Sequence, residues 1–168
     1  TNTRFYEGDN SFSPIHNPDK LEVGQLVWIP SAQAYLDGEN NVHLVTNDGY
    51  DTQLTTAGIY VNPKLASDNR TIGWLVITEY PEYEDGGLSV AEELVIYQDG
   101  KEINRIRPGR FIRSWMFWDT GKQVAIYQGG LYFAGHYFLL DIYTGEILET
   151  SGDLDDTPPD WAHYFRRG

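Results

Sequence analysis

The sequence predicts an all-β protein of two to three four-stranded antiparallel sheets, propeller-like and arranged as an open or incomplete β-propeller or sandwich. About ten short apolar runs are separated by Gly, Pro, Asn and Asp, which is the spacing of strands and tight turns. Aromatic residues make up 14% of the chain, and such side chains favour pleated, half-buried strands. The third observation is an internal repeat of short strands and tight turns.

Composition restricts the class of protein further. A chain of 168 residues fits one domain and buries roughly 70% of its unfolded surface on folding. The absence of cysteine excludes a disulfide scaffold, a thiol nucleophile and a thiolate zinc site. The net charge of -13 and pI of 4.5 disfavour nucleic acid as a partner. No apolar run approaches the ~18 residues of a transmembrane segment.

Along the chain, residues 1–20 form an irregular arm, residues 21–150 a single β-domain and residues 151–168 a C-terminal tail. Two stretches, Ala91–Leu94 and Trp161–Arg166, are each long enough for one helical turn. The predicted strands are Gln25–Ile29, Val42–Thr46, Ile59–Val61, Thr71–Thr78, Glu93–Gln98, Glu102–Ile106, Ile112–Trp118, Gln123–Gln128, Tyr137–Tyr143 and Glu146–Glu149.

Three of these strands are apolar on both faces. In Thr71–Thr78, alternate residues on each side are hydrophobic or glycine, and Gln123–Gln128 and Tyr137–Tyr143 follow the same pattern. A strand with two apolar faces is buried between two layers. The sequence therefore predicts that several sheets stack face to face.

The internal repeat has a period of about 45 to 52 residues, as expected for four-stranded propeller blades. Asp68–Leu75 aligns with Asp119–Ile126, and the hairpin Tyr97–Ile103 aligns with Ile142–Ile147. The two units span about residues 59–106 and 111–149, with a partial unit at 25–54. A closed propeller needs about four to eight blades. The chain is too short to close alone, so self-association of several chains is an open alternative.

The segments Asn69–Leu75, Leu94–Lys101 and Lys122–Ile126 resemble the WD40-like repeats of TolB-type β-propellers, and more closely a group of small uncharacterised bacterial secreted proteins. The resemblance implies a propeller-like architecture but no activity. Together with a first residue other than Met, it implies a periplasmic or secreted location after removal of a signal peptide. An acidic insertion at 79–87 and the first 55 residues depart from the pattern.

The sequence lacks the common motifs of nucleotide-binding and catalytic sites. It contains no phosphate-binding Gly-rich loop, no nucleophile elbow and no His-Glu-x-x-His, and we predict no catalytic residue, no metal and no cofactor. The four histidines have no ligand spacing. His136, at the start of a predicted strand, is the strongest of them as a functional candidate; the others are His16, His43 and His163.

Basic residues gather in one segment of an otherwise acidic chain. Residues 1–99 carry 4 basic and 16 acidic groups, whereas residues 100–168 carry 8 and 9. Arginine suits paired hydrogen bonds to carboxylate or phosphate. The segment predicts a partner-binding surface, or alternatively internal pairing with the protein's own carboxylates. Its candidates are Arg105, Arg107, Arg110 and Arg113, beside Lys101.

Two further segments are candidate contact surfaces. The acidic loop Glu79–Asp85 presents Tyr80 and Tyr83 among four carboxylates, which suits a basic partner, a Ca²⁺ ion or simply a solvated loop. The Gly129–His136 segment presents Tyr132, an aromatic anchor of the kind found in interfaces and sugar sites.

These observations favour a non-enzymatic binding or interaction module, with protein–protein contact in the bacterial envelope as its function. The alternative is a carboxylate-dependent hydrolase or a glycan-binding protein, which leaves a small ligand or glycan open as the partner. A hydrolase of this kind needs two carboxyl groups about 5 to 9 Å apart across a cleft. The candidate acids are Glu79, Glu82, Glu84, Asp85 and Asp119.

Overall fold

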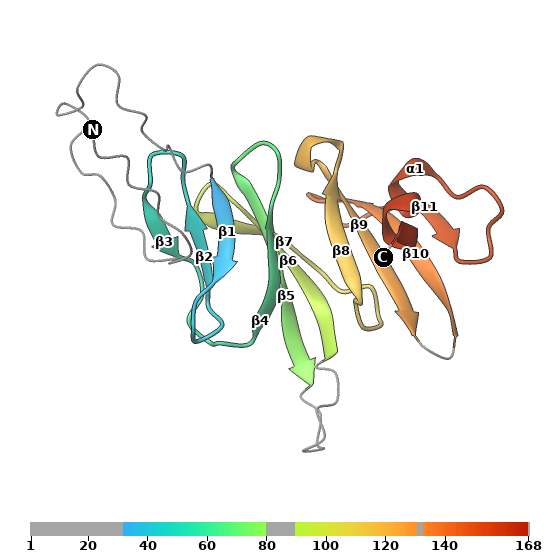
Figure 1. Cartoon of the computed structure of the whole chain (residues 1–168), viewed down its shortest axis with the longest axis horizontal. Coiled ribbons are helices and arrows are strands. Elements are labelled where there is room, and N and C mark those ends of the chain that lie inside the picture. The colour runs from blue at the N-terminus through green and yellow to red at the C-terminus, as the bar shows by residue number, and fades with distance from the viewer. Residues whose placement is uncertain (1–31, 80–89, 131–132, 168) are drawn as a thin grey trace, which may run out of the picture.

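The computed structural model describes residues 32–79, 90–130 and 133–167, which form three antiparallel sheets side by side (Figure 1). Each sheet is a meander in which consecutive strands pair, and none closes within the described residues. The first sheet contains β1 (Gln33–Leu36), β2 (Val42–Val45) and β3 (Asp51–Gln53). The second contains β4 (Tyr60–Leu65), β5 (Thr71–Glu79), β6 (Val90–Gln98) and β7 (Lys101–Ile106). The third contains β8 (Ser114–Trp118), β9 (Gln123–Gly130), β10 (Phe133–Asp141) and β11 (Ile147–Gly152).

The all-β prediction is confirmed, with two local differences. Ala91–Leu94, expected as a helical turn, lies inside β6, because pairing with both β5 and β7 outweighs the helix propensity of Ala and Glu. Two short strands, β1 and β3, were not predicted. The helical turn near Trp161 is confirmed as α1 (Asp160–His163), followed by a 3₁₀ turn at Tyr164–Arg167. The predicted strand Gln25–Ile29 and the arm 1–20 lie outside the described residues.

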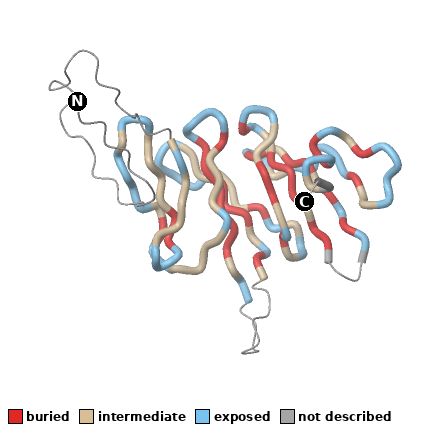
Figure 2. The backbone as a smooth tube through the Cα atoms, viewed as in Figure 1, coloured by how far each residue is buried: buried red, intermediate tan, exposed pale blue. Residues whose placement is uncertain are grey.

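The sheets pack face to face, as predicted from the strands that are apolar on both faces; their buried residues are shown in Figure 2. On β5, Trp74 packs toward the first sheet while Leu75 packs toward the third. On β9, Ile126 faces the second sheet and Ala125 faces the C-terminal helix. Burial of both faces explains why these central strands are hydrophobic at consecutive positions.

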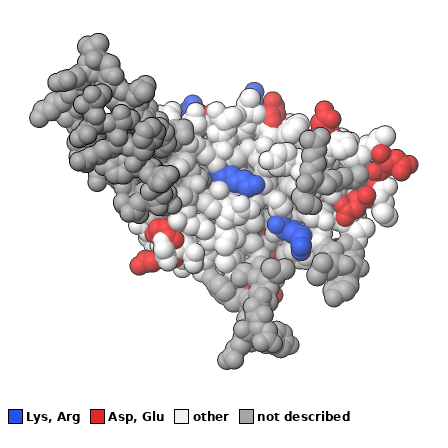
Figure 3. Space-filling model, in the orientation of Figure 1, with Lys and Arg blue, Asp and Glu red and all other residues white. Residues whose placement is uncertain are grey.

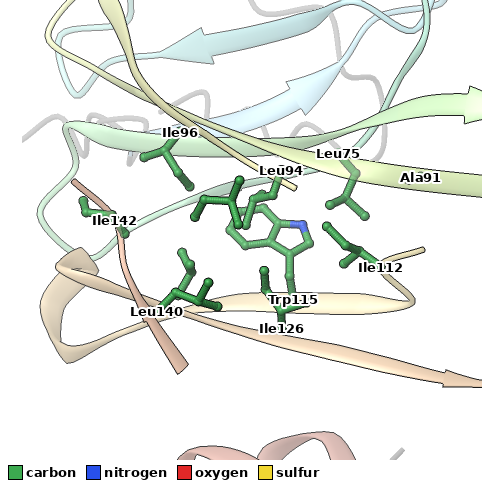
Figure 4. Close-up of a cluster of buried hydrophobic side chains, with 11 residues drawn as sticks. Leu75, Ala91, Leu94, Ile96, Ile112, Trp115, Ile126, Leu140 and Ile142 are labelled. Carbon is green, nitrogen blue, oxygen red and sulfur yellow. The ribbon is translucent and has the colours of Figure 1, made fainter. Parts of the chain in front are cut away.

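Trp115 on β8 is the largest fully buried side chain among the described residues and fills the space between the second and third sheets (Figure 4). Its indole N–H donates to the Asn62 carbonyl oxygen at 3.2 Å. The ring tip reaches over Gly73 of β5, where a Cβ atom would lie only 2.7 Å from Trp115 Cη2. Glycine at this position is therefore required by the close approach of the two sheets.

The C-terminal segment 151–168, expected as a tail, contributes to the core. Trp161 and Ala162 of α1 are buried against the outer face of the third sheet, in a cluster with Met116 and Leu139. The Trp161 indole N–H donates to Glu149 Oε2 at 2.8 Å. The helix thus covers a face that would otherwise expose apolar side chains.

The repeat units predicted at 59–106 and 111–149 correspond to the second and third sheets. The aligned segments after Asp68 and Asp119 become the equivalent strands β5 and β9, and the aligned hairpins become β6–β7 and β10–β11. The partial unit at 25–54 contains the three-stranded first sheet. The first strands of the sheets meet, because β1 contacts β4 and β4 contacts β8.

Candidate functional site

The structure divides the arginine segment into two parts. Arg105 lies on β7 and Arg107 directly follows it, and both bind the carboxylate of Glu93 on the neighbouring strand β6. Arg105 Nη1 donates to Oε2 at 2.7 Å and Arg107 Nε to Oε1 at 2.6 Å. Arg105 also donates to both carboxylate oxygens of Glu102, from Nε at 3.0 Å and from Nη2 at 2.7 Å. These two arginines therefore bind the protein's own carboxylates.

The electrostatics of this network follow from its hydrogen bonds. The bonds from Arg107 and then from Arg105 hold the pKa of Glu93 below its usual value. The bonds to Glu102 and Glu93 raise the pKa of Arg105 above that of an ordinary guanidinium. Only 18% of the Glu93 side chain is exposed, so water screens this network less than a fully exposed pair.

Arg110 and Arg113 differ from this pair. Both are exposed in the connection between β7 and β8, and neither takes part in an ion pair of the described chain. Their backbone is nevertheless fixed, because the Arg110 carbonyl accepts a 2.8 Å bond from Gln128 Nε2 and the Arg113 N–H donates to the Tyr127 carbonyl at 2.9 Å. The two guanidinium groups thus project from an anchored segment.

Of the other candidate residues, His136 is the one that the structure places near Arg110 and Arg113. His136 is exposed on β10 and lies directly opposite Gln128 of β9, the residue that anchors Arg110. It therefore belongs to the same end of the third sheet as Arg110 and Arg113. Tyr80, Tyr83 and Tyr132 lie outside the described residues.

The two candidate acids of the hydrolase alternative that the structure describes, Glu79 and Asp119, lie on different sheets. Of the five candidate acids, Glu82, Glu84 and Asp85 lie outside the described residues, and Glu79 ends β5. Asp119 lines a groove between the second and third sheets without a second carboxylate. Within the described ranges, no three His, Asp or Glu side chains are arranged to hold a metal ion.

Sequence reasoning missed a polar cluster on the outer face of the first sheet. The ring of His43 on β2 lies between two carboxylates, with Nδ1 at 2.9 Å from Asp51 and Nε2 at 3.2 Å from Asp37. Tyr35 on β1 donates to the other oxygen of Asp51 at 2.5 Å. Burial, and then this hydrogen bond, raise the pKa of Tyr35 to about 12. The cluster ties all three strands together. Its members lie on three successive strands and the turn between the first two, and the strand register brings them into contact.

A groove of ≈ 370 Å³ near the meeting point of β4 and β8 was also missed. Aromatic side chains and Lys64 line it, together with the turn that follows β8. These residues include Lys64, Phe117, Trp118, Asp119, Thr120 and Tyr164. Lys64 lies on a strand whose sequence, Tyr60–Leu65, carries no functional motif. No local pattern points to it.

Comparison with protein-family models, with curated protein sequences and with solved structures finds no match to this chain. Among the described residues, no helix has the length and apolar character needed to cross a membrane. The fold and the side chains themselves are therefore the basis of any functional conclusion.

Proposed function

We propose that this protein is a non-enzymatic interaction module, built on an open propeller-like stack of sheets, that contacts another protein in the bacterial envelope through Arg110 and Arg113. The partner presents carboxylates to these two guanidinium groups. His136, at the same end of the third sheet, lies at the edge of the contact.

The observation that carries the proposal is the state of these two arginines. The chain contains 25 Asp and Glu residues, and the other arginines with placed side chains, Arg70, Arg105 and Arg107, each bind an internal carboxylate. Arg110 and Arg113 bind none in the described chain, although their backbone is held by hydrogen bonds. Because the backbone is already fixed, binding a partner orders only the two side chains and not the connecting segment.

The surface charge supports the same conclusion. Figure 3 shows basic side chains near the middle of one face among uncharged residues, whereas acidic side chains gather toward its edges. A strongly acidic protein repels an acidic partner at long range, so local basic groups determine where such a partner docks.

The architecture supports a binding scaffold by analogy. Two four-stranded meanders stack face to face and their first strands converge, an arrangement typical of neighbouring propeller blades. The resemblance of the repeat to TolB-type propellers points the same way. Sheets of this kind hold their connecting loops rigidly, which suits protein contacts.

The experiment is affinity capture from an envelope extract of the producing bacterium, with wild type, Arg110→Glu/Arg113→Glu and a control. The control, Arg70→Glu/Lys101→Glu, has the same net charge but alters exposed turns of the second sheet. We expect a stoichiometric partner with wild type and control and its loss with the Arg110/Arg113 variant. A partner that all three proteins retain, one that both variants lose equally, or no partner at all contradicts the proposal.

A further inference from the structure

The groove beside β4 and β8 plays no part in the proposed protein contact. It has a volume of ≈ 370 Å³, within the range of small-molecule sites in proteins. Its walls come from β4 and the turn that follows it, from β8 and the β8–β9 turn, and from Tyr164 after α1. The chemistry of these walls indicates what the groove binds.

Lys64 is a cation of the groove wall that forms no ion pair with any carboxylate of the described residues. Its side chain is partly buried, and its Nζ lies 5.6 Å from the centre of the Trp115 ring. None of the ion pairs in the described chain includes Lys64. Burial, uncompensated by a carboxylate, lowers the pKa of Lys64. A desolvated ammonium group costs free energy that a bound anion would recover.

The turn that forms the opposite wall has an unusual backbone. Asp119, Thr120 and Gly121 all have positive φ, and Thr120, at φ 55°, is β-branched. A non-glycine residue in this region costs about 1–2 kcal/mol, and such strain gathers at binding sites. Gly121 packs so closely on the β4–β5 turn that a Cβ would lie 2.6 Å from Ala66 Cβ. The two turns are therefore locked together and the groove is preformed.

We infer that this groove binds a small organic anion: a single carboxylate attached to a compact ring. The carboxylate lies against the Lys64 ammonium group and the ring against the aromatic walls at Trp118 and Tyr164. The exposed carboxylate of Asp119 in the same wall disfavours ligands with more than one negative charge. The ring is either a sugar or an aromatic group, because both stack on such walls.

NMR titration of the whole chain tests this inference with two anions, glucuronate and benzoate, and their neutral counterparts, glucose and benzyl alcohol. We expect an anion to shift the resonances of Lys64 and of the 119–121 turn, and the tighter of the two identifies the ring. Loss of a charge-assisted contact in Lys64→Met weakens binding by about tenfold or more. Lys64→Arg, and the matched exposed-lysine control Lys101→Met, retain it.

Three results would overturn the inference. Neutral probes that bind as tightly as the anions would remove the role of the charge. Wild-type affinity in Lys64→Met would remove the role of the lysine. An absence of shifts with all four probes at millimolar concentration would remove the site. None of these results bears on Arg110 and Arg113, so the proposed protein contact stands or falls separately.

Discussion

Replacing Gly73 by alanine perturbs the contact between the second and third sheets directly. The new Cβ would lie 2.7 Å from Trp115 Cη2, 3.1 Å from the Val95 carbonyl oxygen and 3.2 Å from Ile96 Cδ1. The indole is fully buried and cannot swing into solvent. Overpacking of a tight core typically costs about 1–3 kcal/mol, so we expect Gly73→Ala to lose this much stability. In a chain of this size the midpoint of thermal unfolding falls by about 2–12 °C.

Denaturant unfolding of matched variants measures this cost. Gly38→Ala is the control, because nothing lies within 4 Å of a Cβ at that exposed position, and we expect a change within about 0.5 kcal/mol. Trp115→Phe removes the ring tip and should relieve the clash, so the double variant loses less than the sum of the single losses. Equal stability of Gly73→Ala and Gly38→Ala, or strictly additive losses, would refute the packing of Trp115 over Gly73.

Three other predictions follow from single contacts. Trp161→Ala removes the buried ring that covers the third sheet and should cost about 3–5 kcal/mol in urea unfolding; a loss below about 1 kcal/mol would mean that α1 is not part of the core. Thr120→Gly relieves a β-branched residue at positive φ and should stabilise the chain by roughly 0.5–1 kcal/mol in thermal unfolding, whereas destabilisation would contradict the strained turn. The pKa of Glu93 is lowered in the folded chain, so its stabilising effect is present above pH 4.5 and is lost as the pH falls through the folded pKa. In Glu93→Gln, the free energy of unfolding should therefore fall less steeply as the pH drops below about 4.5. The same pH dependence in the variant and the wild type would contradict the Arg105–Glu93–Arg107 network.

The stacking of the sheets was predictable from the sequence because a strand that is buried on both faces is apolar at consecutive positions. Thr71–Thr78 is apolar at consecutive positions, and such a strand has no other stable place than between two layers. The repeat likewise placed equivalent turns at Asp68 and Asp119, since a hairpin turn with positive φ restricts residue choice. In contrast, β1 and β3 are short and half-polar, and their pairing with β2 decides their conformation.

The candidate sites were predictable only in part. The sequence singled out the arginine segment by its charge, but four arginines close together in the sequence cannot be told apart without the structure. Strand register separates them, because it sets Arg105 and Arg107 beside Glu93 and leaves Arg110 and Arg113 in a connection. The Lys64 groove depends on the meeting of β4, the β8–β9 turn and the C-terminal segment, which no local pattern encodes.

A charge-swap experiment tests the proposed function most directly. Cross-linking to the captured partner identifies the acidic residues that face Arg110 and Arg113, and these are changed to lysine. We predict that the partner variant binds wild type weakly but regains affinity for Arg110→Glu/Arg113→Glu, with both interactions weakened by salt. If the reversed pair does not regain affinity while both proteins remain folded, the arginines are not the contact and the proposal is wrong.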